Sequence, residues 1–143
     1  MQVISPLDNL VAAGSLKKEA PDAGEYLGLL RSGTVRLSDA QKGGLSLESR
    51  FDLAYNAAHA FSLATLRRNG YRPTSRYIVF QALEHTLAVR PAVWRVLAKC
   101  HQIRNQGEYE GDLNVDEQLV NDLILACTSI ADVLTKLPPP KKS

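Results

Sequence analysis

The chain has 143 residues, of which 45% are hydrophobic and 22% are charged, and its formal net charge is +2. These values are typical of one globular domain and exclude an intrinsically disordered or fibrous chain. Basic residues are scattered along the sequence, so no electrostatic footprint for binding duplex DNA stands out. No stretch reaches the ~18 apolar residues of a membrane span, and the start lacks the pattern of a secretory signal. We therefore expect a cytoplasmic protein with no membrane segment.

The N-terminal third of the chain contains one irregular segment and one helical segment. In residues 1–21 a short apolar cluster is followed by a glycine, two lysines and a proline, which interrupt any long helical pattern. We interpret these residues as an N-terminal arm or a short helix. From Asp22 onward apolar residues recur at helical spacing, with Gly33 in the middle and Gly43-Gly44 at the end. This pattern predicts one helix or a helical pair.

Four further segments have helical periodicity and helix-capping residues. The expected ranges are 46–69, 73–87, 91–110 and 114–137. Pro91 suits the first turn of its helix, and Asn114 with Glu117 three residues later resembles a capping box. No strand-like alternation competes, and the connections are short, which favours antiparallel neighbours. We predict an all-α fold, an antiparallel bundle of about five helices over residues 22–137, followed by a disordered tail over 138–143.

Neither the cysteines nor any local motif indicates a metal or a cofactor. Cys100 and Cys127 each lie in an apolar helical pattern, without the spacing of a zinc site, so we expect buried, reduced thiols. The sequence contains no glycine-rich phosphate loop and no nucleophile elbow. We expect no metal ligands and no cofactor.

The densest group of polar residues lies at the end of the helix expected over 91–110. At helical spacing, His101, Arg104, Asn105 and Glu108 share one face, which continues an apolar stripe. Such a change from apolar to polar places functional groups at a cleft or a dimer interface, or it marks the point where the helix leaves the core. In the second case Arg104 and Glu108 form an exposed ion pair of small energetic value, and His101 covers the edge of the core.

A second group of polar residues surrounds the turn between the helices expected over 46–69 and 73–87. It consists of Arg67, Arg68, Arg72, Arg76, Tyr71 and Tyr77. Arginines that clamp a phosphate and tyrosines that stack on bases are typical of RNA contacts, so Arg68 and Arg72 are candidate binding residues. Alternatively, Arg67 and Arg68 complement the helix dipole and the other side chains are solvated.

The segment from His101 to Gly111 resembles the motif region of HEPN (higher eukaryotes and prokaryotes nucleotide-binding) domains. The family signature is an arginine, a polar residue directly after it, and a histidine several residues later. Arg104 and Asn105 match the first two positions, whereas Tyr109 occupies the place of the histidine. The helix before the arginine-rich turn also resembles the family in its small residues and its Gly-Tyr-Arg end, so the likeness covers about residues 47–137.

The resemblance implies a metal-independent ribonuclease chemistry, but this chain lacks the histidine that takes part in it. In active members the histidine would transfer protons while the RNA 2′-hydroxyl attacks the neighbouring phosphate, and the arginine would stabilise the charged phosphorane. A tyrosine, with a reference pKa near 10, is a poor base at neutral pH, so Tyr109 is a weak substitute. His101, one turn before Arg104, is an alternative base that Glu108 could tune.

We therefore expect a non-catalytic HEPN-like module that binds a partner protein, RNA or nucleotide and forms a homodimer. The expected binding residues are Arg104, Asn105, Glu108 and Tyr109, together with Arg68 and Arg72. The resemblance implies a toxin–antitoxin or phage-defence setting, with a nucleotidyltransferase-type antitoxin as a partner. Two alternatives stay open, namely an active ribonuclease that uses Arg104 and Asn105 with His101 or Tyr109, and a purely structural interaction domain.

Overall fold

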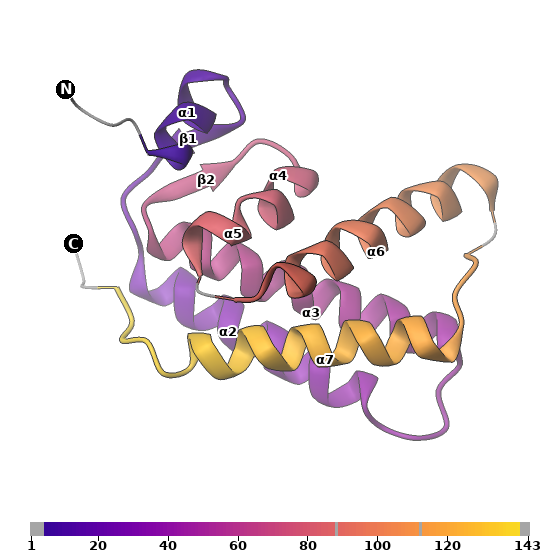
Figure 1. Ribbon diagram of the computed structural model, residues 1–143. Helices are drawn as coiled ribbons and strands as arrows, with labels where there is room; N and C mark the ends of the chain where they lie inside the picture. Colours follow the sequence, from indigo (N-terminus) through magenta and orange to yellow (C-terminus); the bar gives the residue numbers. More distant parts are fainter. Residues whose placement is uncertain (1–4, 88, 112, 141–143) are drawn as a thin grey trace.

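The computed structural model describes residues 5–87, 89–111 and 113–140, and these are mostly helical (Figure 1). The predicted all-α helical bundle is confirmed. In chain order the elements are α1 (Pro6–Ala12), β1 (Leu16–Lys18), α2 (Ala23–Ala40), α3 (Leu47–Arg68), β2 (Tyr71–Pro73), α4 (Arg76–Gln81), α5 (Leu83–Thr86), α6 (Pro91–Glu110) and α7 (Glu117–Leu134).

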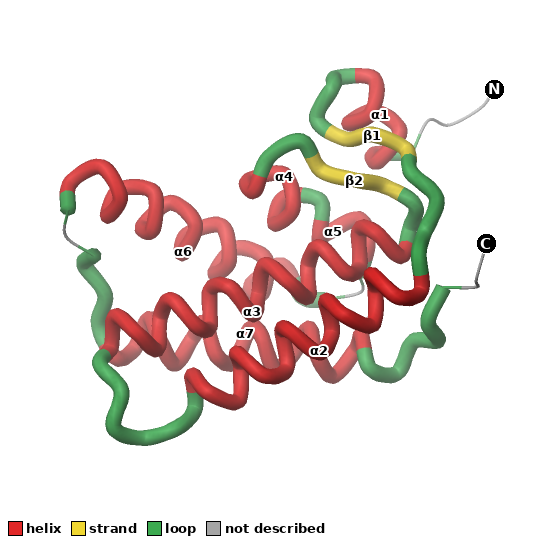
Figure 2. The backbone as a smooth tube through the Cα atoms, turned by 180° about the vertical axis from the view of Figure 1, so that it is seen from behind, coloured by secondary structure: helices red, strands yellow, loops and turns green. Residues whose placement is uncertain are grey.

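Helix α3 is the centre of the bundle, because it is buried along most of its length. α2 runs antiparallel beside it and α7 packs against the same pair, whereas α4, α5 and α6 cover another side (Figure 2). The close approach of these helices depends on fully buried alanines of α3, namely Ala54, Ala57, Ala58 and Ala64. Large apolar residues from α3 and α7, including Phe51, Phe61, Leu123 and Ile130, fill the remaining space of the core.

The segment from Asp22 forms one helix and not a helical pair. The Asp22 carboxylate accepts hydrogen bonds from the backbone N–H groups of Gly24 and Glu25, at 2.8 and 3.2 Å, and so caps the start of α2. Gly33 does not break the helix, because it is buried and the ring of Phe61 lies directly over it. The missing side chain at Gly33 therefore serves helix packing.

Two predicted helix boundaries were wrong. The helix expected over 73–87 begins only at Arg76 and is divided at Ala82 into α4 and α5, since residues 71–73 pair as a strand. The last helix begins at Glu117, because the Asp116 carboxylate accepts from the Leu119 N–H at 2.8 Å. Asp116, not Asn114, is the capping residue.

The expectation that no strands compete with the helices was also wrong. β1 and β2 form a two-stranded antiparallel sheet in which Leu16 is opposite Pro73 and Lys18 is opposite Tyr71. Leu16 is buried in a small second core with Leu7 and Leu66. The arm is therefore docked on the bundle through β1, and both strands were missed because three residues are too few for an alternating pattern.

Both cysteines are buried and unpaired, as the sequence predicted. Burial raises the pKa of Cys100 to about 12 and raises that of Cys127 as well, and the Cys127 thiol donates to the Ala54 carbonyl at 3.2 Å. Within the described part of the chain, no helix is long and apolar enough to cross a membrane.

Candidate functional site

Helix α6 carries the polar group that the sequence singled out. It begins with Pro91 in its first turn, as predicted, and ends at Gly111, whose φ of 74° is the left-handed conformation that favours glycine. Its first half packs into the core through Leu97 and Cys100. Its second half diverges from α7 in both backbone views (Figures 1 and 2). The change from an apolar to a polar face occurs at His101.

His101 lies at the centre of a hydrogen-bonded chain that joins α3 to α6. Its Nδ1 is 2.8 Å from the hydroxyl of Tyr55, and its Nε2 is 3.1 Å from the amide nitrogen of Asn105. His101 is 8% exposed and Tyr55 is 1% exposed. In a neutral imidazole one ring nitrogen donates and the other accepts, so both partners are satisfied without a charge on the ring.

The surroundings of His101 favour the neutral form of its ring. Burial lowers the pKa of His101, the positive charges of Arg104 and Arg76 lower it further, and only Glu108 opposes them. A base for RNA cleavage needs a ring nitrogen that is free to take the proton of the 2′-hydroxyl. Both nitrogens of His101 already have partners, so this arrangement suits a positioning role better than proton transfer.

Arg104 is held over the ring of Tyr55 and is paired with two acidic side chains. Its guanidinium carbon lies 4.8 Å from the centre of the Tyr55 ring, within the range of a cation–π interaction. Arg104 Nη1 is 3.1 Å from a Glu108 carboxylate oxygen, and Nε is 3.8 Å from Asp52. The expected pair of Arg104 and Glu108 is therefore present, although both acidic side chains remain more than half exposed.

An open groove with a volume of about 870 Å³ runs along α6 on the side of His101 and Asn105, and Arg104 and Glu108 are not part of its lining. Its lining consists of Tyr77 from α4 and Ala98, Lys99, His101, Gln102, Asn105, Gln106 and Glu110 from α6. Tyr77 is 51% exposed, and its ring centre lies 5.8 Å from that of His101. This volume is in the range of natural ligand pockets, and the amide side chains offer both donors and acceptors.

The structure places the predicted site residues in two separate regions. His101, Arg104, Asn105 and Glu108 share one region of α6, as expected. The backbone of Tyr109 belongs to α6, but its side chain lies outside the described part of the structure. Arg68, at the other end of α3, contacts the segment after α7, and Arg72, in β2, contacts the N-terminal arm.

Neither arginine of the second region is a free phosphate contact. Arg68 donates to the Pro138 carbonyl at 2.9 Å. Arg72 is paired with Glu19 at 2.6 Å and with Glu25 at 2.7 Å, and the hydrogen bonds that it donates to these carboxylates raise its pKa. Arg67, which the sequence suggested as a charge that complements the helix dipole, is buried and only 2% exposed.

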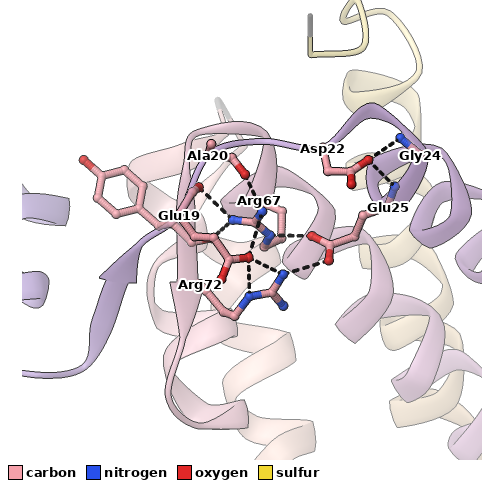
Figure 3. Close-up of polar contacts among 8 residues, drawn as sticks. Glu19, Ala20, Asp22, Gly24, Glu25, Arg67 and Arg72 are labelled. Carbon is pink, nitrogen blue, oxygen red and sulfur yellow. Dashed lines mark hydrogen bonds and ion pairs between the residues drawn. The ribbon is translucent and has the colours of Figure 1, made fainter. Parts of the chain in front are cut away.

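Arg67 ties the N-terminal arm to the bundle (Figure 3). Its guanidinium donates to the backbone carbonyls of Glu19 at 3.0 Å, Ala20 at 2.8 Å and Tyr71 at 3.2 Å, and it also pairs with the Glu25 carboxylate. Burial raises the pKa of Glu25, but hydrogen bonds from Arg72 and Arg67 outweigh this and lower it overall. This network is structural, because its donors are committed to groups within the chain.

Sequence reasoning missed two members of the α6 site. Tyr55 and Asp52 come from α3, and only the fold brings these residues to α6. Spacing along α3 could have placed Asp52 and Tyr55 on one face, but not opposite His101. Among the described residues, no group of three or more His, Cys, Asp and Glu side chains is placed to hold a metal ion.

The free energy of unfolding should depend on pH through His59. Burial lowers the pKa of His59 to about 4, and the charges of Arg76 and Arg104 contribute. Between pH 6.5 and 4 the unfolded chain therefore binds more protons than the folded chain, so stability falls as the pH falls through this window. We expect the free energy of unfolding to drop by about 1–2 kcal/mol more in the parent than in His59→Gln between pH 7 and pH 5.

Urea unfolding at the two pH values measures this difference. His101 and the acidic residues of the arm remain in both proteins, so their contributions cancel in the comparison. An identical loss of stability in the parent and in His59→Gln would show that the pKa of His59 is the same in the folded and the unfolded chain, so that the fold does not lower it.

Comparison of the chain with protein-family models, with curated proteins and with solved structures finds no match. The geometry of α6 and its neighbours is therefore the basis for assigning a function.

Proposed function

We propose that this chain is a non-catalytic HEPN-like interaction module that forms a homodimer through α6. The observation that carries the proposal is the face of α6 that lines the groove. Its residues are polar or small, they are accessible along the groove, and they follow one another at helical spacing. A face of this kind pairs well with a second helix.

The groove face is complementary to itself in an antiparallel pair. Lys99 and Glu110 lie on one flank of α6, eleven residues or about three turns apart. In a two-fold antiparallel arrangement the same flanks meet, so Lys99 of each copy faces Glu110 of the other. Gln102 and Gln106 lie between these charges, and their amides donate to and accept from the same groups of the second copy.

A non-catalytic role is supported by the polar side chains near the motif, because they are already bound to other groups of the chain. Both ring nitrogens of His101 have partners, and Arg104 is neutralised by Glu108 and Asp52. In this proposal Arg104 and Asn105 shape the binding face and do not act on a scissile phosphate. The resemblance further implies a cytoplasmic partner that is a protein, an RNA or a nucleotide, including a nucleotidyltransferase-type antitoxin.

Charge reversal tests the proposed pairing. We expect Lys99→Glu to weaken dimerisation about tenfold or more, because it places two acidic side chains opposite each other at both ends of the helix pair. The double variant Lys99→Glu with Glu110→Lys should restore it, since the charges are exchanged and remain complementary. Sedimentation equilibrium at several protein concentrations gives the dissociation constant of each variant.

Lys136→Glu is the matched control, because Lys136 is exposed beyond the end of α7 and far from the groove face in sequence. It should dimerise like the parent. A parent that stays monomeric, or a double variant as weak as Lys99→Glu, contradicts the pairing.

Incubation of each preparation with total cellular RNA, with and without EDTA, should leave the RNA intact. Cleavage that survives EDTA and is lost in Arg104→Ala would instead make this a ribonuclease.

A further inference from the structure

The N-terminal arm, described here over residues 5–21, holds the segment that leads into α4. β1 pairs with β2, and directly after β2 the Thr74 N–H and hydroxyl both donate to the Ser15 carbonyl, at 3.1 and 2.9 Å. The Tyr71 hydroxyl donates to the Asp8 carboxylate at 3.0 Å. In both backbone views the arm lies beside β2 (Figures 1 and 2). The backbone at the start of α4 is therefore fixed by contacts with the arm.

The arm also packs against one side of α4. Leu7 and Leu16 of the arm share the small second core with Leu66 of α3 and with Ala82 at the end of α4, and Ile78 packs against this core. Leu16 is 2% exposed and Ala82 is fully buried. Ile78 and Ala82 are four residues apart, so they lie on the same side of the helix. This side of α4 faces the arm.

Another side of α4 faces α6 and the groove. The ring centres of Tyr77 and Phe80 each lie 5.8 Å from that of His101. Tyr77 lines the groove from α4, whereas the other lining residues belong to α6. α4 thus lies between the arm and the groove, and it supplies the groove wall that is opposite α6.

α4 is too short to keep this position by itself. It has six residues, and the side chain of Ser75 makes no capping hydrogen bond at its start. Isolated helices shorter than ~12–15 residues are marginal in water, so α4 depends on the surfaces that pack against it. The main core, in contrast, is built from residues that follow the arm, from Tyr26 onward. Loss of the arm would therefore weaken α4 while the packing of α2, α3 and α7 stays in place.

We propose that the arm is a strap that holds α4 against α6 and so keeps the wall of the groove in place. When the arm leaves the bundle, α4 loses one packing surface and Tyr77 loses its fixed position beside His101. The coupling is reciprocal, because a molecule that binds only the complete groove also favours the docked arm. The groove is thus controlled from the far side of α4. This inference does not depend on the dimer function, because it concerns the formation of the groove and not the molecule that fills it.

Amide hydrogen exchange of the full chain, followed by NMR under native conditions, tests the strap. Leu16→Ala removes a buried side chain of the arm, so it should speed the exchange of α4 amides about tenfold or more. A suitable probe is the Ala82 amide, which donates to the Ile78 carbonyl at 2.9 Å. The same variant should shift the imidazole resonances of His101, because the Tyr77 ring lies against that side chain.

Leu123→Ala is the matched control, since Leu123 is also buried but belongs to α7. α7 runs parallel to α3, because Cys127 bonds to Ala54 and Pro138 bonds to Arg68. Leu123 therefore lies near the start of α3, far from the arm at its end. Leu123→Ala should speed the exchange of α7 amides about tenfold or more, and it should change the exchange of α4 amides by less than about twofold.

α4 amides that exchange at the parent rate in Leu16→Ala overturn the proposal, because α4 would then keep its position without the arm. Equal acceleration of α4 exchange by Leu16→Ala and Leu123→Ala also overturns it, since α4 would then open only with the whole bundle. Thr74→Val gives a milder test if Leu16→Ala does not fold. It removes the hydroxyl that donates to the Ser15 carbonyl and should speed α4 exchange about twofold to fivefold. An unchanged rate in this variant contradicts the strap as well.

Discussion

Replacement of Arg67 by methionine should lower the free energy of unfolding by about 3–5 kcal/mol, the usual cost of removing one partner from a buried charged network. Arg67 is 2% exposed and donates to three backbone carbonyls and to the Glu25 carboxylate. Methionine has a similar length but no donor, so these partly buried acceptors lose their partner. Urea unfolding followed by circular dichroism measures the loss.

Arg68→Met is the matched control for Arg67→Met. The two arginines are neighbours at the end of α3, but Arg68 makes an exposed hydrogen bond to a single carbonyl, that of Pro138. We expect Arg68→Met to cost less than about 1 kcal/mol. Similar losses in the two variants would mean that the charge at the end of α3 matters and the buried contacts of Arg67 do not.

Gly33→Ala should destabilise the protein by about 1–2 kcal/mol, although alanine is the better helix former. A Cβ at residue 33 would lie 2.6 Å from Cε1 of Phe61, a distance that real contacts do not show. Phe61 is fully buried, so its ring moves only if the core of α2 and α3 shifts. Overpacking of this kind costs about 1–3 kcal/mol, and the gain in helix propensity returns up to about 1 kcal/mol.

Gly28→Ala in the same helix should have the opposite sign. A Cβ at residue 28 meets no atom within 4 Å, so only the gain in helix propensity remains. We expect a stabilisation of about 0.5–1 kcal/mol. Thermal and urea unfolding of both variants give the two signs directly. A stabilising Gly33→Ala would show that the α2–α3 interface adapts to a larger side chain.

The sequence predicted the bundle and the polar face of α6 because both depend on local periodicity. Apolar residues at helical spacing define α3, and His101, Arg104 and Asn105 fall on one side of α6 for the same reason. Capping residues fixed the start of α3 at Ser46 and that of α6 at Pro91. These features require only residues that are close together in the chain.

The features that the sequence did not predict depend on contacts between distant residues. Arg67 looked like a helix-end charge, and its burial follows only from the docking of the arm. The partner of His101 on α3 was missed because Tyr55 lies 46 residues earlier in the chain. Helical periodicity places a side chain on a face, but it does not say which other helix that face meets.

The docking of the arm through Arg67 has a consequence for the order of events during protein synthesis. The carbonyl of Glu19 is made 48 residues before the guanidinium that binds it. At about 5–20 residues per second, Glu19 is synthesised roughly 2–10 s before Arg67. α7, which completes the core around α3, is made later still. The residues of the arm are thus translated before the partner that holds them, and they cannot dock through Arg67 until α3 has been made.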